Sequence, residues 1–187
     1  LGVLTAAVQG LRTTDARKAA LTRHIWRPRR FRALLDRFGG RTPPPPSRVA
    51  LLASQDPFVD AGPAVGLRSR EEVEARLDVL RADAAAAPIS SEELALIDGL
   101  LNVREKSPYA LSALRDIAVD MPAIGPAVST LDARLDALTK RGIDVDTLDF
   151  EASYGRTSLE YYDGFVFGFA AIDRPDLPPV ATGGRYD

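Results

Sequence analysis

The sequence predicts an α+β fold, with short helices first and an antiparallel β-meander at the C-terminal end. Two observations carry this prediction. Over residues 1–142, apolar residues recur at helical spacing between capping residues, glycines and prolines. After Asp144 the pattern changes to short alternating runs rich in aromatic and β-branched residues. We therefore divide the chain into a helical portion, residues 1–142, and a strand portion, residues 143–187.

Helix starts and stops follow from local chemistry. The apolar segment 1–9 predicts a first helix, and Thr14 or Asp15 can cap a second. Proline lacks the N–H that a helix interior needs, so Pro28 ends that helix and opens another over residues 28–38. The remaining signals are a short helix at 49–53, capping boxes at Ser69 with Glu72 and at Ser90 with Glu93, an N-cap at Ser107 before Pro108, and a last helix from Pro126 to about Gly142.

Three strands are expected in the meander. Residues 146–153 alternate apolar and polar, residues 161–172 are aromatic and β-branched, and residues 178–182 form the last run. A turn signal at residues 174–178 separates the last two.

Composition excludes several kinds of chemistry. The 187 residues carry no cysteine and one histidine, so thiol catalysis, disulfides and cysteine or multi-histidine metal sites are excluded. No apolar run is long enough for a membrane span and no signal peptide is visible, which leads us to expect a cytoplasmic protein. Both ends of the sequence look cut from a longer polypeptide. The net charge of −2 argues against binding nucleic acid over the whole surface.

One stretch is nevertheless basic and aromatic. Arginine and aromatic side chains suit phosphates and bases, so RNA contact is one interpretation. We prefer to interpret it as a solvated helix face, because the chain as a whole is acidic. A surface that binds a partner protein is a third, intermediate interpretation. The stretch comprises Arg23, His24, Trp26, Arg27, Arg29, Arg30, Phe31, Arg32 and Arg37.

Other candidate groups have plainer interpretations. His24 has no nucleophile motif around it, so we expect a solvated or partly buried helical histidine. The carboxylates Asp144, Asp146, Asp149 and Glu151 could serve as general acids or bases, but turn and strand-edge positions explain them better. No metal or other cofactor is expected.

Two segments near the C-terminal end resemble histidine-specific motifs of histidyl-tRNA synthetases. Residues 157–162, Thr-Ser-Leu-Glu-Tyr-Tyr, are similar to Arg-Gly-Leu-Asp-Tyr-Tyr, and residues 182–187, Thr-Gly-Gly-Arg-Tyr-Asp, are similar to Ala-Gly-Gly-Arg-Tyr-Asp. Either alone is a modest signal, but both in this order, with a strand pair between them, are a strong one. The direct match covers about a fifth of the chain, and it implies part of a class II synthetase-like core.

By this resemblance the segments would form a histidine pocket. An imidazole needs an aromatic-walled slot and a few polar groups. Tyr162 and Tyr186 would line it, Glu160 stands at the family's aspartate, and Gly183 with Gly184 would form the floor. The full implied ligand-binding set is Glu160, Tyr161, Tyr162, Gly183, Gly184, Arg185 and Tyr186.

The main departure is at the catalytic arginine of the synthetases. Thr157 stands there, and threonine cannot stabilise the charge that develops during activation. Arg156 is adjacent, but on a strand a shift by one residue would turn its side chain to the opposite face. Ser158 also replaces a glycine of the motif. No catalysis is therefore expected.

The pattern resembles the regulatory subunits of ATP phosphoribosyltransferase, which share the synthetase core without aminoacylation. Residues 4–11 and the arginine-rich helix are similar to alphaproteobacterial members. The resemblance implies a hetero-oligomer with a short-form catalytic subunit, self-association, L-histidine as candidate ligand, and a part in histidine feedback. Two alternatives stay open: a divergent histidyl-tRNA synthetase fragment, and an RNA-binding or protein-interaction module on the same scaffold.

Overall fold

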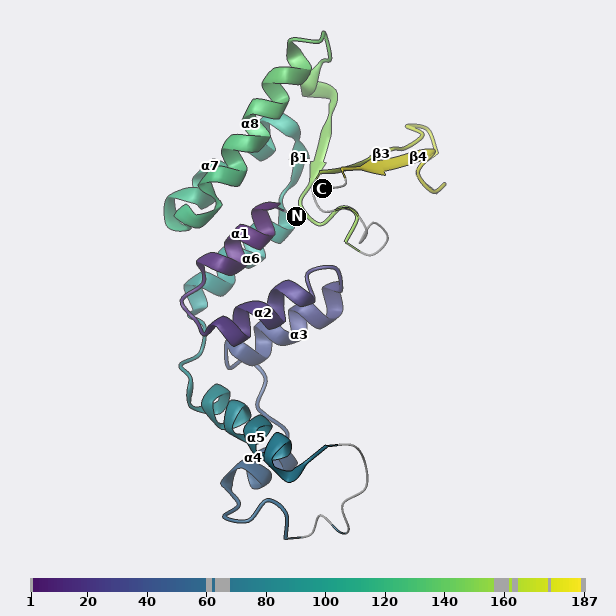
Figure 1. The fold of residues 1–187 in the computed structure, drawn as a ribbon. Coiled ribbons are helices and arrows are strands. Elements are labelled where there is room, and N and C mark those ends of the chain that lie inside the picture. The colour runs from purple at the N-terminus through teal and green to yellow at the C-terminus, as the bar shows by residue number, and fades with distance from the viewer. Residues whose placement is uncertain are drawn as a thin grey trace.

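The computed structural model describes residues 2–59, 62, 68–156, 162, 165–174 and 176–185, and these hold helices and four short strands (Figure 1). The helices are α1 (Gly2–Gly10), α2 (Asp15–Arg23), α3 (Pro28–Phe38), α4 (Pro46–Ala53), α5 (Arg70–Ala85), α6 (Ser91–Asn102), α7 (Ser107–Asp120) and α8 (Gly125–Thr139), with 3-10 turns η1 (Pro122–Ile124) and η2 (Val145–Thr147). The strands are β1 (Arg104–Lys106), β2 (Asp149–Glu151), β3 (Val166–Phe169) and β4 (Ala181–Gly184).

The predicted helix starts are largely confirmed. The Thr14 hydroxyl caps α2 by accepting from the Arg17 N–H at 3.3 Å. Both capping boxes form: Ser69 accepts from the Glu72 N–H at 3.3 Å, and Ser90 from the Glu93 N–H at 3.2 Å. Each such cap typically stabilises a helix by about 1 kcal/mol. Short polar signals therefore fix where these helices begin.

Ser107 is the exception, because it is not an N-cap. Helix α7 begins at Ser107 itself, and Lys106 before it makes no side-chain cap. The Ser107 N–H and hydroxyl both donate to the Leu148 carbonyl, at 2.8 and 3.0 Å. Pairing of β1 with β2 brings the Leu148 carbonyl close to Ser107. The Ser107 hydroxyl donates to this carbonyl and does not cap the helix.

The strands form two separate antiparallel pairs instead of one meander. Strand β2 pairs with β1, a strand that the sequence pattern missed because its three residues are charged and exposed. Opposite charges stabilise this pairing, with Arg104 at 3.3 Å from Glu151 and Lys106 at 2.7 Å from Asp149. Strands β3 and β4 pair with each other, with Val166 opposite Gly184 and Phe169 opposite Ala181.

The core is built by six of the helices. Apolar faces of α1, α2, α3, α6, α7 and α8 meet in one cluster, and Val145, Phe150 and Ala152 pack on its edge. In the part of the chain that the structure describes, no helix is both long and apolar enough to cross a membrane. The largest fully buried side chains are Phe31, Leu11, Leu21, Leu35, Ile89, Leu94, Ile97, Leu100, Leu114, Ile124 and Val8.

The elements are spread along one axis (Figure 1). Helices α7 and α8 lie at one end, α1, α2, α3 and α6 in the middle, and α4 with α5 at the other end, while the β3–β4 hairpin projects to one side. The accessible surface is 12334 Å², against about 8,800 Å² for a compact protein of this mass. The chain therefore leaves far more surface open than a compact domain would.

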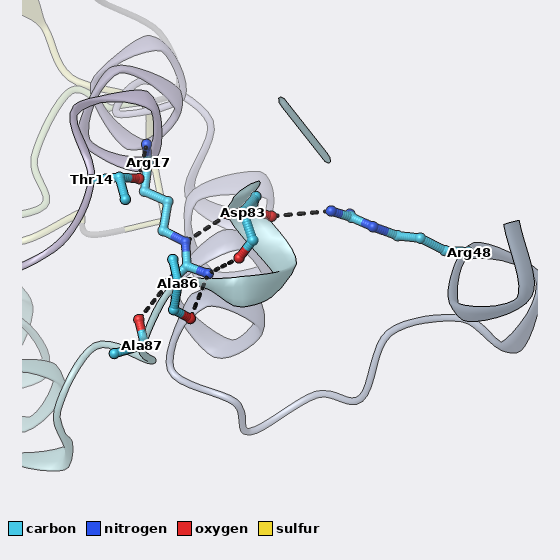
Figure 2. A network of polar contacts seen from close by, with 6 residues as sticks. All are labelled: Thr14, Arg17, Arg48, Asp83, Ala86 and Ala87. Carbon is cyan, nitrogen blue, oxygen red and sulfur yellow. Dashed lines mark hydrogen bonds and ion pairs between the residues drawn. The ribbon is translucent and has the colours of Figure 1, made fainter. Parts of the chain in front are cut away.

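A polar network attaches the α4–α5 pair to the rest. The Arg17 guanidinium, almost fully buried, binds the Asp83 carboxylate at 2.6 Å and the carbonyls of Asp83 and Ala87 at 2.6 and 2.8 Å (Figure 2). Arg48 approaches the second oxygen of Asp83 at 3.0 Å. Leu77 of α5 is buried but lies outside the main cluster. Polar contacts at the C-terminal end of α5 therefore help to hold the α4–α5 pair in place, whereas apolar packing holds the other helices together.

Candidate functional site

The candidate site is the β3–β4 hairpin with the segment before it. Of the seven predicted ligand-binding residues, the structure places Tyr162, Gly183, Gly184 and Arg185. Glu160, Tyr161 and Tyr186 lie outside the described residues, as do Thr157 and Ser158. The structure therefore describes the two glycines, Tyr162 and Arg185 of this site.

The two glycines are sites of close approach by aromatic rings. A Cβ added at Gly184 would lie 2.6 Å from Tyr162 Cδ2, and one added at Gly183 would lie 2.6 Å from Phe167 Cζ. Real Cβ atoms do not come so close, so only glycine fits under these rings. Because Gly183 and Gly184 are successive residues of β4 and face opposite sides of the hairpin, Tyr162 covers one side at Gly184 and Phe167 covers the other at Gly183.

Aromatic rings follow one another along β3. Phe165, Phe167 and Phe169 occupy alternate positions, with successive ring centroids 5.9 and 5.7 Å apart. All three stay partly open to solvent, Phe169 to 63%. Tyr154 lies over the opposite face of β3, because a Cβ at Gly168, between Phe167 and Phe169, would lie 2.9 Å from its Cζ. Alternate spacing on a strand was the signal for this row, whereas Tyr154 comes from a turn and carried no signal.

Two arginines border the aromatic row. The Arg134 guanidinium of α8 lies 4.4 Å from the Phe165 ring centroid, a cation–π contact. Burial lowers the pKa of Arg134, and the nearby charge of Arg185 lowers it further. The Arg185 N–H donates to the Phe165 carbonyl at 2.9 Å, continuing the hairpin past β4. Positive charge therefore gathers at this end of the hairpin, where an anionic group of a ligand would be stabilised.

Arg156 lies in a turn, which corrects the expectation of a strand at this position. Residues 152–156 form a turn, and the Arg156 side chain is buried against α3 and the connection that precedes it. Its Nε donates to the Ile25 carbonyl at 2.8 Å, and the guanidinium lies 5.0 Å from the Phe31 ring centroid. Burial lowers the pKa of Arg156, and Arg32 adds a smaller effect. Arg156 thus anchors the chain just before the histidine-motif segment.

The other candidate groups have structural roles. Asp144 accepts from the Asp146 N–H at 3.1 Å and caps η2, while Asp149 and Glu151 pair with the cations of β1. Turn and strand-edge positions, as predicted, explain them. Within the described residues, no group of acidic or histidine side chains could hold a metal ion. His24 is half-buried, as predicted, but it is the C-cap residue that follows α2 instead of lying within the helix.

A small cavity lies elsewhere, between α7 and α8. Its volume is about 190 Å³, and Arg115, Ala118, Gly125, Val128, Ser129 and Asp132 line it. Pockets for small organic ligands usually exceed about 300 Å³, and the Arg115–Asp132 ion pair at 2.6 Å occupies one wall. This cavity therefore does not compete with the hairpin as a ligand site.

Comparison with known proteins identifies relatives by sequence. The chain is 30% identical over 159 residues to the ATP phosphoribosyltransferase regulatory subunits of Brucella ovis, Brucella abortus and Brucella canis. In each case the match covers 79% of this chain and 42% of the relative, so the chain spans less than half the length of these relatives. No family model matches the chain. No solved structure matches it either.

These relatives carry the same name that the paired C-terminal motifs suggested. The similarity also extends far beyond those motifs, which cover only about a fifth of the chain. Over 79% of its length, this chain is similar to proteins named ATP phosphoribosyltransferase regulatory subunits, of which it covers 42%.

Proposed function

We propose that this chain is part of a non-catalytic regulatory subunit of ATP phosphoribosyltransferase. The observation that carries the proposal is the similarity, over 79% of the chain, to proteins of that name. Thr157, where histidyl-tRNA synthetases have their catalytic arginine, supports a role without catalysis. In this role the protein acts in the cytoplasm, binds a short-form catalytic subunit and supports the first step of histidine biosynthesis.

The proposal includes a ligand. The hairpin offers aromatic rings on both sides, the row beside Gly183 on one side and Tyr162 over Gly184 on the other, and arginines border the row; these groups suit a molecule with a planar ring and a carboxylate, and L-histidine has both. Glu160, Tyr161 and Tyr186 would complete the pocket by resemblance. Histidine bound there would transmit feedback inhibition to the catalytic partner.

The first experiment tests the assembly. The full-length protein is purified together with a short-form catalytic subunit, and phosphoribosyl transfer is measured with and without the regulatory chain. We expect a stable complex and a rise in activity. Histidine-dependent exchange between ATP and pyrophosphate by the full-length protein alone would contradict the proposal, because it would demonstrate a working synthetase.

The second experiment tests the pocket within the complex. Tyr162→Ala removes one aromatic wall, and Gly184→Ala places a methyl group where the Tyr162 ring lies. We expect both variants to weaken histidine binding and to raise the histidine concentration that gives half inhibition. Tyr109→Ala is the control, because Tyr109 lies on α7 and is 70% exposed. Unchanged inhibition in both pocket variants would show that the pocket is vestigial.

A further inference from the structure

Four arginines lie at the adjoining ends of α2 and α3 and in the connection between these helices. Arg23, Arg27, Arg29 and Arg30, here named the turn arginines, are all exposed. Within the described residues, none of their side chains has an ion pair, a hydrogen bond or a ring contact. Four cations that have no partner among the described residues therefore lie within eight residues of the chain.

The neighbouring arginines are different, because each has a partner. Arg17 and Arg48 share Asp83, and Arg32 and Arg41 share Asp98. The Arg37 guanidinium lies 4.7 Å from the Phe38 ring centroid. The carboxylates near α3 are thus already paired with other cations, and none serves the turn arginines.

Three of the turn arginines act on one neighbouring side chain. His24 follows α2 directly, and burial, followed by the charges of Arg27, Arg30 and Arg23, lowers its pKa. The charges of three guanidinium groups therefore act on one imidazole. Like charges held together repel, so the arrangement costs stability unless an anion binds there.

The composition of the whole chain does not explain this charge. Residues 1–59 contain eleven arginines and lysines against three aspartates. Residues 60–187 contain thirteen basic residues against twenty-three acidic ones. The chain is acidic overall, yet its N-terminal third is strongly basic, and the turn arginines belong to that excess and have no partner in the part of the chain that the structure describes.

We propose that the turn arginines dock an acidic surface of a protein partner, and that this partner is the catalytic subunit. The inference rests on the proposed function, which supplies that partner. Exposed charges of this kind steer association and set its salt dependence more than they set affinity. Arginine is also enriched at protein interfaces.

The same stretch is poorly suited to RNA. Recognition of single-stranded RNA uses exposed aromatic faces on which bases stack. Trp26 is only partly exposed and packs against the core cluster, while Phe31 is fully buried. The net charge of the chain is also negative, so a polyanion would be repelled outside this patch. A protein with a local acidic surface avoids both difficulties.

The experiment compares two variants of the full-length regulatory protein with equal charge change. One carries Arg23→Gln, Arg27→Gln and Arg30→Gln. The control carries Arg68→Gln, Arg76→Gln and Arg141→Gln, three exposed arginines elsewhere whose side chains have no partner in the described part of the chain. Association with the catalytic subunit is followed at low and at physiological salt. We expect roughly tenfold slower association at low salt for the first variant, with a reduced salt dependence, and little change for the control.

The outcomes separate the two proposals. If the wild-type proteins associate and the turn variant associates equally fast, the docking surface is refuted and the proposed function stands. If the wild-type proteins do not associate at all, both fail. Loss of RNA binding or of self-association by the turn variant, with normal docking to the catalytic subunit, would also refute the docking surface. A charge-conserving variant, with lysine at the same three positions, should associate nearly as fast as wild type.

Discussion

His24 gives the chain a single titration near neutral pH that can be followed alone, since there is no other histidine. Its pKa is lowered from 6.5 by burial and by the charges of Arg27, Arg30 and Arg23. The neutral form is therefore favoured in the folded state. Stability that is present above pH 6.5 should be lost as the pH falls from there through the lower folded pKa.

Two measurements check this expectation. The imidazole proton signal in NMR should titrate below pH 6.5, and Arg27→Gln should raise that pKa. The urea midpoint of wild type should fall between pH 7.5 and pH 5 by more than that of His24→Gln, which cannot titrate. A folded pKa at or above 6.5 would contradict the expected surroundings of His24.

Contacts between individual residues were the part of the structure that the sequence predicted least well. Motif spacing predicted that Tyr162, Gly183 and Gly184 share a site; the structure packs Tyr162 against Gly184, whereas Gly183 faces Phe167 on the other side of the hairpin. Arg156 was expected on a strand, facing away from Thr157. Its burial against Ile25 and Phe31 depends on contacts with residues about 130 positions earlier, and no local pattern encodes them.

Elements bounded by caps were predicted well, and those defined by pairing were not. The residue range of α3 and both capping boxes were evident from prolines, serines and glutamates. Strand β1 was missed because Arg104, Glu105 and Lys106 show no apolar alternation. It forms by pairing with β2, more than forty residues later, so only the folded chain reveals it.

Gly99 in helix α6 tests the effect of helix propensity on stability at a position with room for a methyl group. Gly99 is exposed in this helix, and a Cβ there would lie 4.0 Å from the nearest side-chain atom, Ile117 Cδ1. Gly99→Ala should therefore stabilise the protein by about 0.5–1 kcal/mol, because glycine costs entropy in a helix. Urea unfolding measures the change.

Gly39→Ala is the matched opposite case, at the C-terminal cap of α3. A Cβ there would lie 3.2 Å from the Leu35 carbonyl oxygen and would collide with the Leu94 side chain. We expect this variant to be less stable than wild type. If both alanines changed stability in the same direction, the packing around α3 and α6 would differ from that described.

At the scale of the whole molecule, Arg17 holds the α4–α5 pair to the helical core (Figure 2). Arg17→Met should lower stability by about 3 kcal/mol, the lower end of the range for breaking a buried ion pair, because Asp83 keeps Arg48. Arg76→Met, at an exposed position of α5, should change it by less than about 0.5 kcal/mol. Hydrogen exchange should rise mainly in α4 and α5 of the first variant. A uniform rise over all helices would contradict the attachment role of Arg17.

The elongated form has a thermodynamic consequence. Unfolding a chain of this mass exposes about 20,500 Å² when the folded state is compact. The folded surface of 12334 Å² leaves only about 17,000 Å² to expose. The m-value in urea and the heat-capacity change scale with this difference, so both should be about one-sixth below those of a compact domain of equal length. The stability curve of the isolated chain should accordingly be flatter with temperature, and it should steepen when a partner covers the open surface.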